Sequence, residues 1–430
     1  MQIFIFSPIP YSFLHQRPQK LADQYVEKGH QVTFIEPCGL TEYLSGRKKG
    51  LPLLVIRSVW YFFLGLAAIV IPRMLRKPAL RGDGDEQGEG PKIASMPIIV
   101  PNNRVNSAMM ERLNASIYRQ AIRGLFRHID PNEETLAIVE NPLWGLVLQR
   151  GDFTRLAYDC IDEISLFAGR GSVERMECYE RRLIEMSDAV CVTAEKLEET
   201  LRPKVLGRPL VRLPNGVDYD YFQRRIQECG PPDALAGVRR PIVGYVGVLR
   251  NWMDYALVEY LARTLTQVSF VLVGPVDFEN RLESIRKIPN VILMGRREYR
   301  DVPAFINAFD VCVIPFLPGP VSNTTNPVKL FEYFALGRPV VSTRLRELEK
   351  FADQGLLRMA DNREEFASAV TDALAERTPG VKEMRKEVAR AHSWKSIADQ
   401  LFAVAMSRED SPPRRRGAEG KSNSHITSKG

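Results

Sequence analysis

The chain has 430 residues, of which 45% are hydrophobic and 26% charged. This composition excludes a disordered or fibrous protein, and the length exceeds one ordinary α/β domain but suits two. The net charge of +7 favours an anionic partner. Because the basic residues are not interleaved with aromatic ones, we expect no nucleic-acid partner.

Six cysteines are scattered along the chain without a CxxC spacing: Cys38, Cys160, Cys178, Cys191, Cys229 and Cys312. Several lie in apolar runs typical of strands, so we interpret the cysteines as reduced core residues and expect a cytoplasmic location. The first ten residues carry no basic leader before their apolar run, which indicates a first strand and not a secretory signal.

Short apolar runs alternate with amphipathic stretches in the first half of the chain. Gln2–Phe6 predicts a buried strand, Pro18–Lys28 a helix that begins at a proline, and Gln31–Glu36 a second strand. Strands separated by helical segments predict βαβ units and a mainly parallel sheet. Further predicted elements are strands at Thr135–Glu140, Leu156–Cys160 and Ala189–Thr193 and a helix near Val173–Glu185.

The same pattern restarts after a stretch rich in proline and glycine. Two doubly wound α/β domains are therefore expected, residues 1–222 and 241–393, joined by a linker at 223–240. Residues 394–406 predict a final amphipathic helix, which the family resemblance described below implies crosses back to the first domain, and the polar residues 407–430 predict a disordered tail. The five strands predicted in the second domain are Pro241–Gly247, Ser269–Gly274, Asn290–Met294, Val311–Ile314 and Pro339–Ser342.

Residues 51–75 are strongly apolar, and Val59–Ile71 contains no charge. A helix of that uncharged part covers about 20 Å, which is shorter than the roughly 30 Å hydrocarbon layer. Basic residues flank the segment on both sides. We therefore expect it to rest on the inner face of the cell membrane as a monotopic segment, with a buried crossover helix as the alternative.

The strongest local pattern is Asn326–Val341. Asn326 can cap a helix whose first turn carries Lys329, and Glu332 shares the face of Lys329. The free N–H groups and the positive dipole end of such a helix suit a diphosphate, and a carboxylate at Glu332 can accept hydrogen bonds from ribose hydroxyls. The alternative is a surface Lys–Glu pair on an ordinary helix.

Other stretches agree with this segment in order and spacing. Together they resemble GT-B glycosyltransferases, especially the family 4-like bacterial enzymes that build cell-surface polysaccharides of the teichuronic acid or exopolysaccharide type. The resemblance covers about residues 1–45 and 95–405. It rests on Asn326–Val341, Gln16–Gln19 with Gly29 and His30, Asn141–Pro142, Tyr158–Glu163, Leu213–Asp218, Gly244–Asp254 and Leu272–Pro275.

The resemblance implies an α/β, GT-B fold, with two Rossmann-like domains that face each other across a cleft. It implies transfer of a sugar from a nucleotide sugar, expected to be UDP-linked, to a saccharide or lipid-linked acceptor. Glu332 matches the second glutamate of the family's E-x7-E pattern, the one expected at the ribose, and Lys329 matches a basic position near the diphosphate. Gly247 would allow the donor to approach the backbone.

The sequence departs from the family pattern at three positions. The first glutamate of E-x7-E is replaced by Thr324, and the basic residues expected after Gly247 in retaining members are Val248 and Met253. Arg250 is the candidate to replace the missing basic residues. These departures leave open whether the transfer inverts or retains the anomeric configuration.

On the acceptor side, an inverting enzyme needs a general base that faces the cleft. Asp159 and Asp162, at the end of a predicted strand, are the candidates, and capping or ion pairing of these carboxylates is the alternative. His15, Gln16 and Arg17 lie in the loop after the first strand, where an arginine suits an acceptor phosphate. A surface position of Arg17 at the helix start is equally compatible with the sequence.

No DxD pattern stands at a strand end, so we expect neither a metal nor a cofactor beyond the nucleotide-sugar substrate. Lys329 and the helix N-terminus would stabilise the leaving diphosphate instead. Two other classes of function stay open at this point. One is a nucleotide-sugar epimerase of the same fold, and the other is a non-catalytic sugar- or lipid-binding scaffold, which the departures from the family pattern would also fit.

Overall fold

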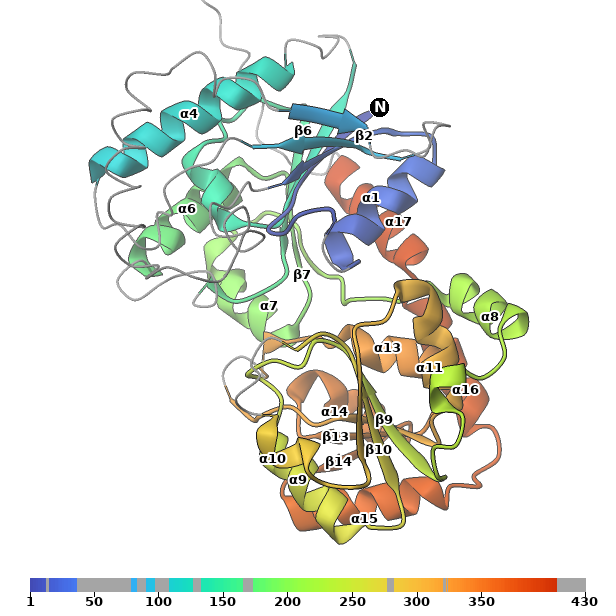
Figure 1. The fold of residues 1–430 in the computed structure, drawn as a ribbon. Helices are drawn as coiled ribbons and strands as arrows, with labels where there is room; N and C mark the ends of the chain where they lie inside the picture. The colour runs from blue at the N-terminus through green and yellow to red at the C-terminus, as the bar shows by residue number, and fades with distance from the viewer. Residues whose placement is uncertain are drawn as a thin grey trace, which may run out of the picture.

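The computed structural model describes residues 1–12, 15–36, 79–82, 90–96, 108–126, 133–164, 173–276, 282–319, 322 and 324–407. These residues form two α/β domains, one above the other in Figure 1, each built on its own sheet. The apolar segment 51–75 and the tail 408–430 lie outside the described residues, so the membrane and tail predictions stay predictions. Within the described part of the chain, no helix has the length and apolarity that a membrane crossing requires.

The first sheet has eight strands in the order β3-β4-β2-β1-β5-β6-β7-β8. All neighbours are parallel except β3 and β4, which pair antiparallel. The bounds are β1 Gln2–Phe6, β2 Gln31–Glu36, β3 Ala79–Gly82, β4 Lys92–Ser95, β5 Thr135–Val139, β6 Arg155–Cys160, β7 Ala189–Val192 and β8 Leu210–Arg212.

Helices cover both faces of this sheet, which is why its strands are apolar on both sides. Along β1, Phe4 and Phe6 point into one hydrophobic core and Ile3 and Ile5 into another, as the two-residue period of a strand requires. The helices of this domain are α1 Arg17–Glu27, α4 Ala108–Phe126, α6 Val173–Met186 and α7 Glu195–Leu201, with short 3-10 turns at Pro142–Leu146 and Arg202–Lys204.

The second sheet has six parallel strands in the order β11-β10-β9-β12-β13-β14. The strands are β9 Ile242–Val246, β10 Ser269–Val273, β11 Val291–Gly295, β12 Val311–Ile314, β13 Val340–Thr343 and β14 Arg358–Ala360. The helices are α9 Tyr255–Thr264, α10 Glu283–Arg286, α11 Val302–Ala308, α13 Val328–Ala335, α14 Arg346–Asp353, α15 Arg363–Leu374 and α16 Val381–Ala391, with a 3-10 turn at Tyr299–Asp301.

The two domains are joined twice. The chain passes from the first to the second through α8 (Tyr219–Glu228) and a 3-10 turn at Asp233–Leu235, and it returns through α17 (Trp394–Met406). Trp394, Ile397 and Leu401 of α17 lie in a core of the first domain, so the last helix crosses back as expected. The second domain begins earlier than the expected boundary at residue 222, because Val217 and Phe222 lie in its core.

Most of the expected strands lie within a residue of their observed bounds. The strands β3, β4, β8 and β14, which have only three or four residues each, were not expected from the sequence. The expectation that all cysteines are core residues holds for Cys160, Cys191 and Cys312, whereas Cys178 is exposed and Cys229 is partly exposed. Helix α6 carries Cys178 on its solvent side, which its amphipathic pattern explains.

In both sheets the strand order reverses beside the first strand of the domain. The first sheet reverses between β1 and β5, and the second between β9 and β12. At such a switch point the loops from neighbouring strands diverge to opposite faces and leave a crevice at the carboxyl ends of the strands, where ligands of open α/β sheets bind. The fold therefore directs attention to the residues that follow these four strands.

Candidate active site

Three neighbouring strands of the second sheet, β9, β10 and β11, end in glycines with positive φ: Gly247, Gly274 and Gly295. A Cβ on Gly247 would lie 2.1 Å from Cε of Lys329, and a Cβ on Gly274 would lie 1.9 Å from the carbonyl oxygen of Gly247. Glycines therefore leave the backbone without side chains at the place where Lys329 of α13 passes the end of β9. This edge can accept a ligand against the backbone.

Helix α13 begins at Val328, and its N-cap residue is Pro327. The prediction that Asn326 caps this helix is wrong. The Asn326 side chain instead accepts a hydrogen bond from the backbone N–H of Asn215 (3.0 Å), and the Asn215 amide donates to the Asn326 carbonyl (2.7 Å). Asn326 therefore ties the loop before α13 to the segment between the domains, and the N-cap residue of the helix, Pro327, provides no side-chain cap.

Lys329 and Glu332 lie together on α13, with Nζ and Oε2 3.9 Å apart. Glu332 is 7% exposed. Burial raises the pKa of its carboxyl, while the positive charges of Lys329 and Lys20 lower it. Because Glu332 is buried and the charge of Lys20, from α1 of the first domain, acts on it, Glu332 lies near the domain junction and away from bulk solvent.

A bridging cluster of four residues spans the junction beside Glu332. Lys20 contacts Asp218 (2.6 Å) and lies 4.0 Å from the ring centroid of Tyr299, and the Tyr299 hydroxyl donates to Asp218 (2.8 Å). His15 stacks on the same ring at 6.1 Å between centroids. Burial and the charge of Lys20 lower the pKa of His15. The structure thus places His15, predicted on the acceptor side, against a tyrosine of the second domain.

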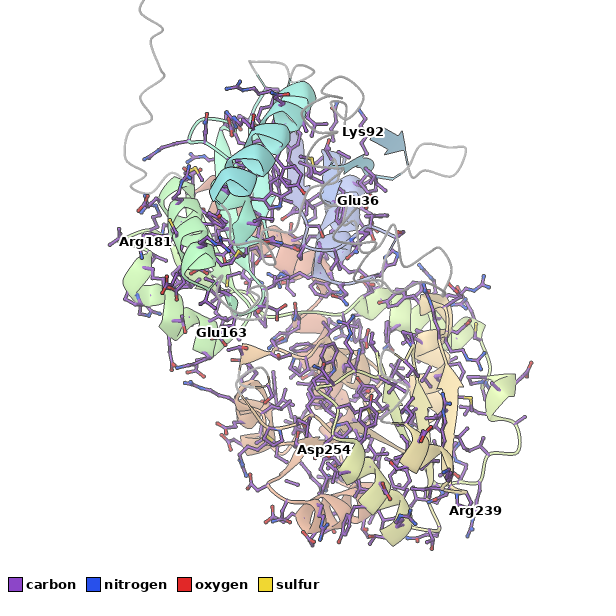
Figure 2. The ribbon with its side chains drawn as sticks, turned by 60° about the vertical axis from the view of Figure 1, so that its left-hand side comes forward. Glu36, Lys92, Glu163, Arg181, Arg239 and Asp254 are labelled. Carbon is purple, nitrogen blue, oxygen red and sulfur yellow. The ribbon has the colours of Figure 1, made fainter. Side chains whose placement is uncertain are left out.

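Arg250 lies in the loop between β9 and α9, with its guanidinium 5.2 Å from the ring centroid of Trp252. Two cavities, of about 600 and 770 Å³, open at the start of α9, and both are lined by Asp254, which Figure 2 labels. The larger one also contacts Lys196 of the first domain. Neither of these two cavities is lined by Lys329 or Glu332.

On the first domain, Arg17 and Asp159 form a fully buried ion pair. Arg17 is 3% exposed and Asp159 is 0% exposed. Nε of Arg17 donates to Oδ2 of Asp159 (2.7 Å), Nη2 donates to Oδ1 (2.9 Å), and Nη1 donates to the carbonyl of Pro214 (3.0 Å). This geometry argues against Asp159 as a general base and against Arg17 as a phosphate ligand, because neither group has a free, accessible position.

Asp162 and Gln16 have different environments. Asp162 follows β6 and is partly exposed, and burial raises the pKa of its carboxyl to about 6. It therefore remains a candidate to accept a proton near neutral pH. The backbone N–H of Gln16 donates to the side chain of Gln19 (3.2 Å), so Gln16 begins α1 as its N-cap residue.

Glu140 is a buried acid that the sequence pattern did not single out. It follows β5 at the switch point, is 1% exposed, and in the described part of the chain neither of its carboxyl oxygens has a hydrogen-bond partner. Burial raises the pKa of Glu140 well above its ordinary value, and the neighbouring Asp159 raises it further. The available signal was an acid directly after an apolar strand, but the sequence does not show that it lacks a partner.

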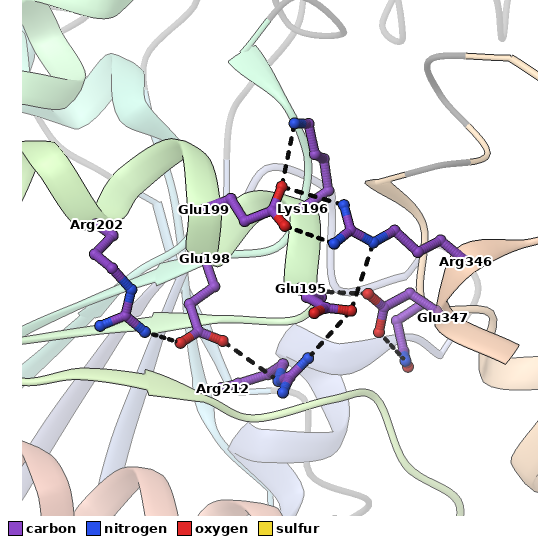
Figure 3. A network of polar contacts seen from close by, with 9 residues as sticks. Glu195, Lys196, Glu198, Glu199, Arg202, Arg212, Arg346 and Glu347 are labelled. Carbon is purple, nitrogen blue, oxygen red and sulfur yellow. Dashed lines mark hydrogen bonds and ion pairs between the residues drawn. The ribbon is translucent and has the colours of Figure 1, made fainter. Parts of the chain in front are cut away.

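A network of charged side chains joins α7 of the first domain to α14 of the second (Figure 3). Arg346 binds Glu199 (2.5 Å) and Glu195 (3.5 Å), and the backbone N–H of Glu195 donates to Glu347 (2.5 Å). The Asn326 amide lies 3.4 Å from the other Glu347 oxygen. This network, the α7–α14 clasp, therefore reaches the loop that precedes α13.

In the described ranges, no three His, Cys, Asp or Glu side chains are grouped as a metal site requires. The expectation that neither metal nor cofactor is needed stays a prediction. The first-domain edge offers a buried ion pair and two acids, and the second-domain edge offers glycines, a lysine and a glutamate.

The second domain matches a known family. Residues 240–376 match the model of the family described as glycosyl transferases group 1. The chain is also 26% identical over 277 residues to TuaH of Bacillus subtilis (strain 168), a protein assigned to teichuronic acid biosynthesis as a glycosyltransferase. That match covers 61% of this chain and 69% of TuaH.

Solved structures match along nearly the whole chain. Sucrose-phosphate synthase of Thermosynechococcus elongatus is similar with a TM-score of 0.65 at 16% identity, over 94% of this chain and 98% of that one. HepE of Anabaena in complex with UDP-glucose gives 0.58 at 14% identity, over 94% and 98%. The fold, the family match and the relative together identify the chain as a glycosyltransferase with the GT-B fold.

Proposed function

We propose that the chain transfers a sugar from a UDP-sugar to a saccharide or lipid-linked acceptor in the synthesis of a cell-surface polysaccharide. The observation that carries the donor assignment is the position of Lys329 directly over Gly247 and 3.9 Å from Glu332. A diphosphate at this place would meet Lys329 and the first backbone N–H groups of α13, and ribose hydroxyls would donate to Glu332.

Two comparisons support the choice of donor and acceptor. HepE, which shares the fold, was solved in complex with UDP-glucose, and the relative TuaH is assigned to teichuronic acid biosynthesis. Arg250, in the loop after Gly247, is the further side chain proposed to contact the donor. A donor that binds here must displace or rearrange the bridging cluster, since Lys20, Asp218 and Tyr299 lie beside Glu332.

The acceptor is proposed to bind at the first-domain edge, with His15 and Asp162 towards it. Asp162 would accept a hydrogen bond from the reacting hydroxyl, and in an inverting transfer it would also take the proton while the bond to the sugar forms and the diphosphate leaves. The membrane surface is proposed to be reached through residues 51–75 on the inner face of the membrane, where a lipid-linked acceptor would be available.

Calorimetry with UDP and UDP-glucose tests the donor site. Glu332→Ala and Lys329→Ala should each weaken UDP binding at least tenfold, because each removes a hydrogen-bonding or charged contact worth about 1.4 kcal/mol or more. Glu349→Ala, which removes an exposed carboxylate of α14, is the matched control. Unchanged UDP affinity in both site variants would refute the placement. Release of free epimer from UDP-glucose without an acceptor would favour an epimerase.

A further inference from the structure

Glu140 lies at the switch point of the first domain, where a ligand-facing residue is expected but a buried, unpaired acid is found. Its backbone N–H donates to the carbonyl of Phe6 (3.1 Å), so the residue is held between the ends of β1 and β5. It is 1% exposed, and neither carboxyl oxygen has a hydrogen-bond partner among the residues that the structure describes. Buried polar side chains in native proteins almost always have a partner, so this exception needs an explanation.

The surroundings of Glu140 decide its charge. The charged groups that act on it are Asp159 of β6, Arg17 of α1 and Asp162 of the loop after β6. Among these three groups of the described residues, Arg17 is the cation, and its Nε and Nη2 already bind both oxygens of Asp159. One guanidinium cannot balance two buried carboxylates, and an unpaired buried carboxylate protonates because the cost of burying its charge is several kcal/mol.

Asp162 differs from Glu140 in its access to water. It is partly exposed, whereas Glu140 is sealed from solvent. When two nearby carboxyls compete for one charge, the charge resides on the better solvated group. The directions of the pKa shifts agree, since Asp162 raises the pKa of Glu140, and the pKa of Asp162 is raised by burial alone.

We propose that Glu140 is a positioning residue that stays protonated at the first-domain switch point. Because Glu140 carries no charge, Asp162 remains the ionised carboxylate at this edge of the sheet. The inference rests on the proposed function only in assigning Asp162 to the acceptor. If Glu140 lost its proton, its charge would drive Asp162 towards the protonated form, and Asp162 could then no longer accept a hydrogen bond or a proton from the acceptor hydroxyl.

Infrared spectroscopy of the full chain at pH 7.5 tests the charge of Glu140. The wild type should show a protonated-carboxyl C=O band that is absent in Glu140→Gln. The control is Glu163→Gln, which removes a neighbouring carboxyl at the end of the first domain that faces the second (Figure 2) and should keep the band. A wild type without this band, or a band whose intensity is unchanged in Glu140→Gln, overturns the proposal.

The titration of Asp162 tests the coupling. In the chain labelled with ¹³C at aspartate Cγ, the Asp162 signal, assigned by its loss in Asp162→Asn, should titrate near pH 6 in wild type and move by less than about half a unit in Glu140→Gln. A fall of one unit or more would show that wild-type Glu140 is charged and would overturn the proposal. Neither measurement needs a substrate, so failure of UDP to bind in calorimetry would count against the proposed function alone.

Discussion

Arg17 and Asp159, 142 residues apart in the chain, form a bidentate ion pair. Nε of Arg17 lies 2.7 Å from Oδ2 of Asp159, and Nη2 lies 2.9 Å from Oδ1. Arg17 begins α1 and Asp159 lies in β6, so the pair joins the helix after the first strand to a strand two places further across the sheet. Both oxygens of Asp159 are thus bound by Arg17, and Nη1 of Arg17 donates to the carbonyl of Pro214. The sequence suggested a phosphate ligand and a base at these two positions, and the structure shows a connection that holds the first-domain edge.

Arg17→Met should therefore lower the free energy of unfolding by about 3–5 kcal/mol, because it leaves Asp159 as a buried charge without a partner. Urea unfolding at pH 7.5 measures this effect. Arg263→Met removes one partner of an exposed pair with Glu259 and should cost less than about 1 kcal/mol. Equal losses in the two variants would show that the Arg17–Asp159 pair is not insulated from solvent.

Gly247→Ala should abolish UDP binding while the chain still folds. The new Cβ would lie 2.1 Å from Cε of Lys329 and would push the lysine from the edge. Gly237→Ala is the matched control, because Gly237 also has a positive φ but nothing lies within 4 Å of its Cβ position. Both variants should lose about 1–2 kcal/mol of stability from the backbone alone. Similar UDP affinity in both would contradict the assignment of Gly247 to the donor site.

Asp162 should make the protein less stable as the pH rises. Its pKa is about 6 in the folded chain against 3.8 in its ordinary state, so the folded state binds more protons between these values and stability falls across this range. Asp162→Asn should remove this dependence and be more stable than wild type at pH 7.5 by ~2–3 kcal/mol. Urea unfolding of both chains at pH 4 and pH 7.5 measures the difference. A stability difference that does not grow with pH would contradict the raised pKa.

Arg346→Met should loosen the contact between the domains. Arg346 binds Glu195 and Glu199 of the first domain, but Arg346 is 35% exposed and each glutamate is 45% exposed, so the loss should be about 1 kcal/mol or less and should shrink at high salt. Small-angle scattering should show a larger radius of gyration than in wild type. Arg344→Met serves as control, because Arg344 pairs with Asp361 and Glu349 within its own domain. An equal increase in the radius of gyration of both variants would show that loss of the α7–α14 clasp is not its cause.

The local pattern of residues determined most of the architecture. Apolar runs such as Gln2–Phe6 and Ser269–Val273 are buried on both faces, so hydrophobicity alone identifies them as strands of a covered parallel sheet. The proximity of Lys329 and Glu332 could also be predicted from the sequence, because residues three apart on a helix share a face. The alternation of these runs with helices was enough to predict two doubly wound domains, while the return of the last helix to the first domain was expected from the family resemblance.

Tertiary structure alone decided the partners of the charged residues. Asn326 looked like a helix cap, yet it bonds to Asn215, and Arg17 and Asp159 looked like substrate ligands, yet they bind each other. Glu140 was indistinguishable from any acid after a strand until the absence of a partner became visible. The reason is physical: hydrophobic burial depends on the period of the local sequence, whereas a charge is satisfied by whichever opposite charge or donor the fold brings within about 3 Å, at any separation along the chain.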